Sequence, residues 1–398
     1  MTPGALAGLS VLELGRMVAA PYCGKLLADL GADVVKVEDP GSGDPARRRG
    51  PFPDDLPHPE RSGLFLYLNT SKRSITLDLG TETGRRIFRS LVAQVDILIE
   101  DTSPGELERL GLSYPTLAEL NPRLIMTSIT PFGQTGPYQN YRSHHLNLYH
   151  CSGHTSSVQP PGSTDDRPPP MGGGYVGEYD GGLVAAVGTM AAVLGRNPNG
   201  SGQHIDLSKQ EAMMCLERVD IGRLTNDPNP KPWRSLLGGL PKAKDGYFQI
   251  TPIENHQWAG LMQVMGKPAW STADWCKDEI GRQDHRDEIR GRIDEWAADL
   301  TRDEIYHLTQ TQGVPVGPVR NVAEVRDWDQ AKARDFFVEL EHPDAGKQVY
   351  PTAAYRFSKT PWNGAPAPRL GEHNQEIYCD LLGYSLQDLT QLSASGVI

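Results

Sequence analysis

Short apolar runs alternate with amphipathic stretches along the first third of the chain. The apolar runs predict strands at residues 10–14, 33–38, 74–79, 95–100 and 124–129. Between them, apolar residues at helical spacing predict helices at residues 19–30 and 83–93, and Gly15 and Gly31 mark turns. Strands that alternate with helices are typical of a parallel, doubly wound sheet, so the pattern predicts an α/β fold.

After about residue 150, the regular alternation of strands and helices gives way to proline- and glycine-rich segments and a second unit. Residues 182–194 form an apolar helical run, and 204–207 predict a further strand. Residues 160–174, with five prolines and four glycines, predict a loop, and 226–232 (NDPNPKP) predict a linker into a second unit. For that unit and the residues after it, the pattern predicts strands at 247–252 and 314–319, helices at 258–265 and 287–300, a proline-rich extended segment at 361–368 and a last helix at 374–382.

Composition restricts the class of protein. A chain of 398 residues is long enough for two domains, and its net charge of -11 argues against broad nucleic-acid binding. The five cysteines show no CxxC spacing and predict free thiols in a reducing compartment. The longest apolar run, 183–194, is too short to span a membrane, and no signal peptide is visible. We therefore expect a cytoplasmic protein without membrane or nucleic-acid partners.

Several common nucleotide and hydrolase motifs are absent from the sequence. The turn after the first strand reads GRMVAAPYCG rather than GxGxxG, so Glu38 at the end of the second strand is weak evidence for a dinucleotide site. There is no P-loop and no GxSxG elbow. His144, His145, His150 and His154 gather around Cys151, but acidic or paired cysteine ligands at standard spacing are missing, so we expect no metal.

The segment MGGGYVGEYDGGLVAA, residues 171–186, is a candidate for chemistry. It predicts Glu178 in a glycine-rich turn before an apolar helix, where a carboxylate can act as a nucleophile or acid/base. The structural alternative is a surface turn in which Asp180 caps the helix. Basic pairs and triplets at 47–49, 72–73 and 85–86 are either solvated faces or a grip for a phosphate-rich ligand.

Six blocks distributed over nearly the whole chain resemble CoA-transferase family III, which includes formyl-CoA:oxalate and carnitine CoA-transferases and the α-methylacyl-CoA racemases. The matching blocks are LAGLSVLELGRMVAAPYCGKLLADLGADVVKVEDPGSGDPARRRGP, NTSKRSITLDL, PGELERLGLSYPTLAELNPRLIMTSITPFGQTGPY, GSGQHIDLSKQEAM, GVPVGPV and APRLGEHNQEI. Each block is weak alone, and together they are specific.

The resemblance implies a Rossmann-like large domain, an inserted smaller α/β domain and an interlocked homodimer. The corresponding division is a large domain at 1–208, a linker at 209–230, a small domain at 231–325, a linker at 326–345 and a C-terminal part at 346–398 that completes the large domain. A heteromer with a related subunit is the alternative assembly.

The resemblance also implies a mechanism. Glu178 stands where the transferases carry a nucleophilic aspartate that accepts an acyl group and then CoA, with Asp180 as the reserve candidate. His144 falls where the racemases carry a catalytic histidine, and Glu254 lies near their paired glutamate. CoA or acyl-CoA is expected as a substrate rather than a tightly bound cofactor. The residues expected to contact it are Arg16, Ala19, Arg47, Lys72, Arg73 and Arg109.

Three functions follow from this resemblance. The preferred one is transfer of CoA from an acyl-CoA, with succinyl-CoA as a candidate donor, to a carboxylic acid through a glutamyl-CoA thioester. The alternatives are an α-methylacyl-CoA racemase or epimerase, and a non-catalytic subunit of a heteromeric transferase. Replacement of aspartate by the longer Glu178 permits the first chemistry but moves the carboxylate by more than ~1 Å.

Overall fold

The computed structural model describes residues 3–154, 170–196, 200–216, 222, 225–227 and 240–398. The chain divides into two compact units. The first comprises Met1–Thr155, Met171–Ile221 and Ala333–Ile398, and the second comprises Ser156–Pro170 and Gly222–Lys332. The loop predicted at 160–174 and the linker predicted at 226–232 lie largely outside them.

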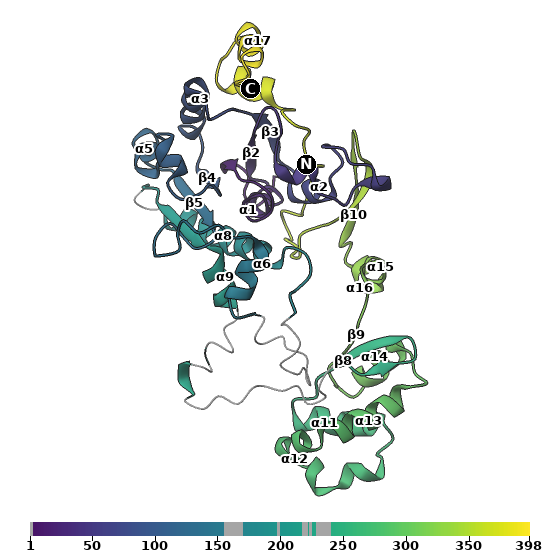
Figure 1. The fold of residues 1–398 in the computed structure, drawn as a ribbon. Coiled ribbons are helices and arrows are strands. Elements are labelled where there is room, and N and C mark those ends of the chain that lie inside the picture. The colour runs from purple at the N-terminus through teal and green to yellow at the C-terminus, as the bar shows by residue number, and fades with distance from the viewer. Residues whose placement is uncertain (1–2, 155–169, 197–199, 217–221, 223–224, 228–239) are drawn as a thin grey trace. The chain divides into compact units, whose positions relative to one another are not determined.

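The first unit is built on a six-stranded parallel sheet (Figure 1). Its strands are β1 (Ser10–Leu14), β2 (Asp33–Glu38), β3 (Arg73–Thr76), β4 (Ile97–Glu100), β5 (Ile125–Thr130) and β6 (His204–Ser208). The strand order β3-β2-β1-β4-β5-β6 is that of a doubly wound nucleotide-binding sheet. The predicted parallel α/β sheet is therefore confirmed, and for β1 and β2 so are the predicted strand bounds.

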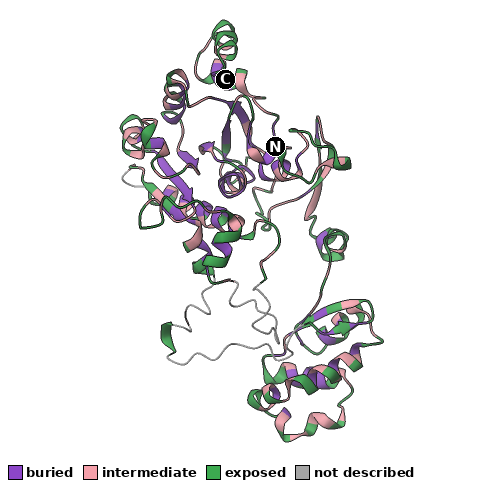
Figure 2. Cartoon of the chain, in the orientation of Figure 1, coloured by how far each residue is buried: buried purple, intermediate pink, exposed green. Residues whose placement is uncertain are grey.

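Both faces of this sheet are covered, which explains why most residues of its strands are buried, polar ones included. Neighbouring residues point to opposite faces: Val11 belongs to one buried cluster and Leu12 to the other. The helices on the face of Val11 are α1 (Ala19–Ala28) and α8 (Val176–Gly195); on the face of Leu12 are α3 (Glu82–Val92), α4 (Glu106–Arg109) and α5 (Tyr114–Leu120). Figure 2 shows the sheet as buried, as expected for a parallel sheet between two helical layers.

The outer edge of β3 is covered by a segment from the far end of the chain. The N–H of His373 donates to the carbonyl of Ser74, and the N–H of Thr76 donates to the side chain of Asn374. The hydroxyl of Tyr378 donates to the carbonyl of Thr76 at 2.6 Å. Because these bonds satisfy the groups that an edge strand leaves open, the sheet does not end in a bare edge here.

The C-terminal region agrees with its prediction in part. The helix predicted at 374–382 is present over residues 374–381, of which Glu376–Leu381 are π-helical. It is not the last helix, because α17 (Leu386–Ala394) follows it and begins at a Ser385 cap. A hairpin of β10 (Phe337–His342) and β11 (Gly346–Pro351) also belongs to this unit and was not predicted. The alternation of Val338 and Leu340 with Glu339 and Glu341 in β10 was a usable signal, whereas β11 (GKQVYP) shows no such alternation.

The second unit has a small antiparallel sheet and a layer of helices. The sheet has the order β7-β8-β9, from β7 (Lys242–Ala243), β8 (Gly246–Ile250) and β9 (Val316–Pro318). The principal helices are α11 (Asn255–Val264), α12 (Glu279–Asp284), α13 (Arg286–Ala297) and α14 (Arg302–Gln310). Helices α11, α13 and α14 share one core with the sheet, around Phe248, Leu261 and Ile293. The predicted strands and helices of this unit are confirmed with shifts of a few residues at their ends.

None of the helices in the described residues is long and apolar enough to cross a membrane. All five cysteines lie in described parts of the chain and are unpaired.

Candidate active site

The charged side chains that could take part in a reaction lie at the carboxyl ends of the parallel strands. Chain connections leave β1 toward one side of the sheet and β4 toward the other, so the space beyond these two strands is a topological switch point. Arg16 follows β1 and Asp101 follows β4, and the N–H of Arg16 donates to Asp101 at 2.9 Å. Burial raises the pKa of Asp101 to about 7, although the Arg16 N–H and the Lys209 ammonium oppose the shift.

The loop between β1 and α1 is held in an uncommon conformation. Met17 has a φ of 61°, in the left-handed region, and its N–H donates to Asp44 at 2.9 Å. Lys36 anchors the same loop by donating to the carbonyl of Gly15 at 2.6 Å and pairing with Asp44 at 2.9 Å. Backbone in this region is retained only where its surroundings enforce it, and such positions cluster at functional sites.

Glu178 lies in the first turn of α8, which begins at Val176, after Tyr175. The prediction of a turn before the helix is wrong, and so is the reading of Asp180 as its cap, because the helix starts about five residues earlier than expected. Glycine disfavours helices, so Gly177, Gly181 and Gly182 read as a turn in the sequence. Close packing explains them instead: a Cβ on Gly177 would lie 2.3 Å from the sulfur of Met213.

Helix α8 is seated directly on α1. A Cβ on Gly182 would lie 2.5 Å from the carbonyl oxygen of Ala19, so the two helices approach backbone to backbone. The ring of Tyr179 packs edge-on against Tyr22 with their centroids 4.9 Å apart. These contacts bury Ala19 and determine where the neighbouring Glu178 lies.

Lys209 pairs with Glu178. It is the first residue of α9 (Lys209–Leu216), immediately after β6, and its Nζ lies 2.8 Å and 2.9 Å from the two carboxylate oxygens. Both side chains are 13% exposed. Lys209 was not among the predicted site residues, although a lone cation directly after a strand, at the carboxyl edge of a parallel sheet, was a usable signal.

Asp180 and His144 lie on elements near Glu178. Burial raises the pKa of Asp180, and His154 partly opposes this. His144 is exposed at the start of α6 (His145–Cys151), where its N–H donates to the side chain of Asn147 at 3.2 Å. The ring of His145, the next residue, lies 5.3 Å from that of Tyr175 at the start of α8. Glu254 belongs to the second unit and precedes α11.

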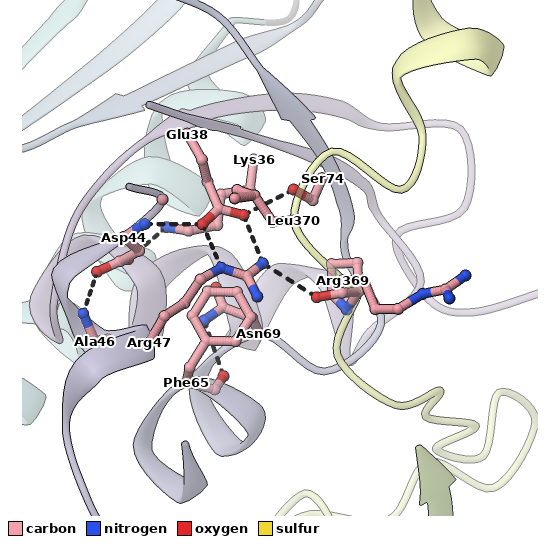
Figure 3. Close-up of polar contacts among 12 residues, drawn as sticks. Lys36, Glu38, Asp44, Ala46, Arg47, Phe65, Asn69, Ser74, Arg369 and Leu370 are labelled. Carbon is pink, nitrogen blue, oxygen red and sulfur yellow. Dashed lines mark hydrogen bonds and ion pairs between the residues drawn. The ribbon is translucent and has the colours of Figure 1, made fainter. Parts of the chain in front are cut away.

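Two of the predicted CoA contacts are interior ion pairs. Arg47 is fully buried. It makes two hydrogen bonds to Glu38, at 2.7 Å and 2.8 Å, and its guanidinium lies 3.7 Å from the centroid of the Phe65 ring (Figure 3). A further hydrogen bond, at 2.6 Å, goes to Glu60. Burial raises the pKa of Glu38, but the Arg47 guanidinium and other donors outweigh it and hold this pKa below its usual value.

Lys72 is the second interior cation. It pairs with Glu13 at 2.7 Å and donates to the carbonyl of Pro21 at the same distance. Burial lowers the pKa of Lys72 to about 8, against the effect of Glu13. In this arrangement, Lys72 joins β1 to α1 and Arg47 joins the end of β2 to Glu60, and their cationic groups are occupied by carboxylates.

Of the other predicted CoA contacts, Ala19 is buried and the three arginines are closer to solvent. Arg16 and Arg109 are exposed, and Arg73 is half-buried in ion pairs with Asp33 and Glu376. Among the residues that the structure describes, no three histidine, cysteine or acidic side chains come together as a metal-binding group.

Known proteins that are similar to this chain in sequence and in structure indicate one family. The family model described as CoA-transferase family III matches residues 6–374. The succinyl-CoA–D-citramalate CoA-transferase of Chloroflexus aurantiacus is 33% identical over 100% of this chain and 98% of its own. The formyl-CoA:oxalate CoA-transferase of Afipia carboxidovorans is 30% identical over 99% of this chain and 97% of its own. A CAIB/BAIF family protein from Brucella suis matches with a TM-score of 0.82 and 30% identity, over 96% of this chain and 100% of its own.

Proposed function

The chain belongs to CoA-transferase family III, and we propose that it moves CoA from an acyl-CoA to a carboxylic acid with Glu178 as the covalent nucleophile. The observation that carries the proposal is the position of Glu178 in the first turn of α8, at the carboxyl edge of the sheet and 2.8 Å from Lys209. Its carboxylate is largely shielded from water without being enclosed, which suits a nucleophile that must reach a thioester.

The transfer proceeds through two kinds of acyl intermediate. A Glu178 oxygen attacks the carbonyl of the donor thioester, giving a mixed anhydride and free CoA thiolate. The thiolate then attacks the Glu178 carbonyl, which forms a Glu178–CoA thioester and releases the donor acid as a carboxylate. The acceptor carboxylate reverses these steps: it attacks the thioester, and the expelled thiolate then attacks the acyl carbonyl of the new anhydride. This gives the product acyl-CoA and regenerates the Glu178 carboxylate.

The phosphates of CoA need local cations because the chain as a whole is acidic. We propose Arg16, Arg73 and Arg109 as the cations that approach the phosphates. Direct contact by Arg47 or Lys72 would require CoA to displace their buried carboxylate partners, so we propose that these two act by holding the loop between β1 and α1.

The relatives suggest substrates to try first. The one from Chloroflexus aurantiacus is named for succinyl-CoA and D-citramalate, and the one from Afipia carboxidovorans for formyl-CoA and oxalate. We propose a small acyl-CoA as donor, with succinyl-CoA tested first, and a small carboxylic acid as acceptor.

We also propose a homodimer, with a related second subunit as the alternative. The support is an apolar stripe on α8, where Val176, Leu183, Val187 and Leu194 are all exposed in the single chain. Light scattering of the purified protein gives the mass, and a monomer at micromolar concentration would contradict this proposal.

Trapping the covalent intermediate tests the proposed function. The protein is incubated with succinyl-CoA or another small acyl-CoA, then with hydroxylamine or borohydride, and the peptide containing residues 171–196 is analysed by mass spectrometry. We expect the hydroxamate or the reduced alcohol at Glu178. Modification at Asp180 would move the nucleophile, and an unmodified peptide with every donor would favour the non-catalytic subunit.

A further inference from the structure

In the resting protein, Lys209 is paired with Glu178, and this ion pair cannot persist once Glu178 is acylated. Its Nζ contacts both carboxylate oxygens of Glu178, at 2.8 Å and 2.9 Å, and only 13% of its side chain is exposed. Lys209 also lowers the pKa of Asp101. Among the ion pairs of the described residues, Glu178 is the one carboxylate partner of Lys209, so the charge of this largely buried cation depends on Glu178.

The fold makes room for this pair. The stem of Lys209 lies across α8 at Gly181, one helical turn after Glu178, where a Cβ would lie 3.0 Å from Cγ and 3.5 Å from Cδ of the lysine. Glycine inside a helix costs about 1 kcal/mol relative to alanine. The missing side chain at Gly181 gives Lys209 the path by which its ammonium reaches Glu178.

Acylation of Glu178 removes the charge that balances Lys209. This step rests on the proposed function: in the anhydride and in the CoA thioester, the Glu178 oxygens are neutral. A buried cation that loses its partner is strongly destabilised. At the thioester stage, a carboxylate lies beside the same carbonyl, first the departing donor acid and then the arriving acceptor acid.

We propose that Lys209 binds the reacting carboxylate of the substrate acid whenever Glu178 carries CoA. The cation then alternates between two carboxylates, one from the protein and one from the substrate. It donates hydrogen bonds and transfers no proton. The acceptor carboxylate leaves Lys209 as it attacks the thioester, the thiolate is expelled, and Glu178 returns to Lys209 when its carboxylate is released from the final anhydride. The ligand class of this subsite is any small carboxylate, with no need for a second acidic group.

The first test separates acid binding from CoA binding. Lys209→Met and Lys209→Arg are assayed with the donor acyl-CoA and the acceptor acid varied in turn. We expect Lys209→Met to raise the KM for the acid about tenfold or more and to change the KM for acyl-CoA little, since a lost charged hydrogen bond has that size. Lys209→Arg should restore much of the acid affinity.

Discharge of the trapped intermediate isolates the same step. The Glu178–CoA thioester is formed with acyl-CoA, freed of excess donor, and mixed with increasing acid. We expect Lys209→Met to need about tenfold more acid for half-maximal discharge. An unchanged acid requirement in a variant that forms the thioester would overturn the role of Lys209 and leave the proposed function standing. Failure of the wild-type protein to form the thioester or transfer CoA would overturn both.

A second pair of variants keeps the test independent of folding at position 209. In Gly181→Ala, the added methyl group pushes on the stem of Lys209, whereas in Gly188→Ala, on the same helix, it would lie an ordinary 3.8 Å from Ile205. We expect Gly181→Ala to raise the KM for the acid and Gly188→Ala to leave it unchanged. Equal effects of the two substitutions would contradict the proposal.

Discussion

Gly182 and Ala19 bring two helices into backbone contact, because a Cβ on Gly182 would lie 2.5 Å from the Ala19 carbonyl oxygen. We predict that Gly182→Ala forces α8 away from α1 and lowers the free energy of unfolding by about 1–3 kcal/mol. Since Glu178 lies one turn away, activity should fall as well. Urea unfolding measures the effect, and Gly188→Ala is the matched control. Equal stability of the two variants would contradict the packing argument.

Glu178 should be indispensable for transfer. Glu178→Gln keeps the size of the side chain and removes its nucleophilic charge, so we expect CoA transfer to fall on the order of 10³-fold or more. Circular dichroism should still show the native secondary structure, since the amide oxygen can accept a hydrogen bond from Lys209, although loss of the charge partner should lower the free energy of unfolding. Asp180→Asn is the comparison: if it abolishes transfer while Glu178→Gln does not, Asp180 is the nucleophile.

Transfer should proceed without proton exchange at the α-carbon. A racemase needs an acid/base pair on opposite sides of that carbon, whereas a transferase needs one nucleophilic carboxylate. In deuterated water, we expect a 2-methylacyl-CoA to gain no deuterium in the absence of an acceptor acid. Mass spectrometry of the recovered thioester is the measurement. Rapid exchange that His144→Ala removes would establish the racemase instead.

Substitution of a buried arginine should lower stability, whereas substitution of an exposed arginine should weaken CoA binding. Arg47→Met leaves Glu38 buried without its partner, and we expect the free energy of unfolding to fall by about 3–5 kcal/mol. Arg109→Ala removes an exposed cation, so it should leave stability nearly unchanged and raise the Kd for CoA about threefold to tenfold, less at high salt. Calorimetric titration and urea unfolding give the two quantities. A stable Arg47→Met protein with weakened CoA binding would make Arg47 a direct phosphate contact.

Asp101 should make stability depend on pH. Its folded pKa of about 7 lies above the value of about 3.9 in an unfolded chain, so between these pH values the folded state binds more protons. Its contribution to the free energy of unfolding therefore falls as pH rises from about 4 to about 7. Asp101→Asn should remove this component, as measured by urea unfolding at several pH values. Glu108→Gln, at an exposed carboxylate, should keep the wild-type profile.

The sequence predicted the sheet well because the physical signal is local. The runs SVLEL and DVVKVE are short, β-branched and bounded by glycine or polar turns, and their bounds agree with β1 and β2. Each run also contains a charged residue, Glu13 or Lys36, that the structure pairs in the interior at 2.9 Å. A charge within a buried strand indicates a partner, but the sequence does not say which.

Positions that depend on distant packing were harder to predict. The start of α8 was misplaced because its glycines are required by close packing against α1 and α9, and both helices are remote in sequence. Lys209 itself is 31 residues from Glu178, and nothing in the local pattern joins them. For Arg47 and Lys72, the charge was visible in the sequence but the buried carboxylates opposite them were not.

The segment that covers β3 links the start of the chain to residues more than 290 positions later, as the pairing of Ser74 with His373 shows. During synthesis, strands β1 to β6 emerge from the ribosome long before this segment, so a sheet that forms on the growing chain has an outer edge still open to other chains. Completion of the first unit must wait until the whole second unit has been made. Until then, the chain itself does not cover this edge, and its protection from misassembly depends on other components of the cell.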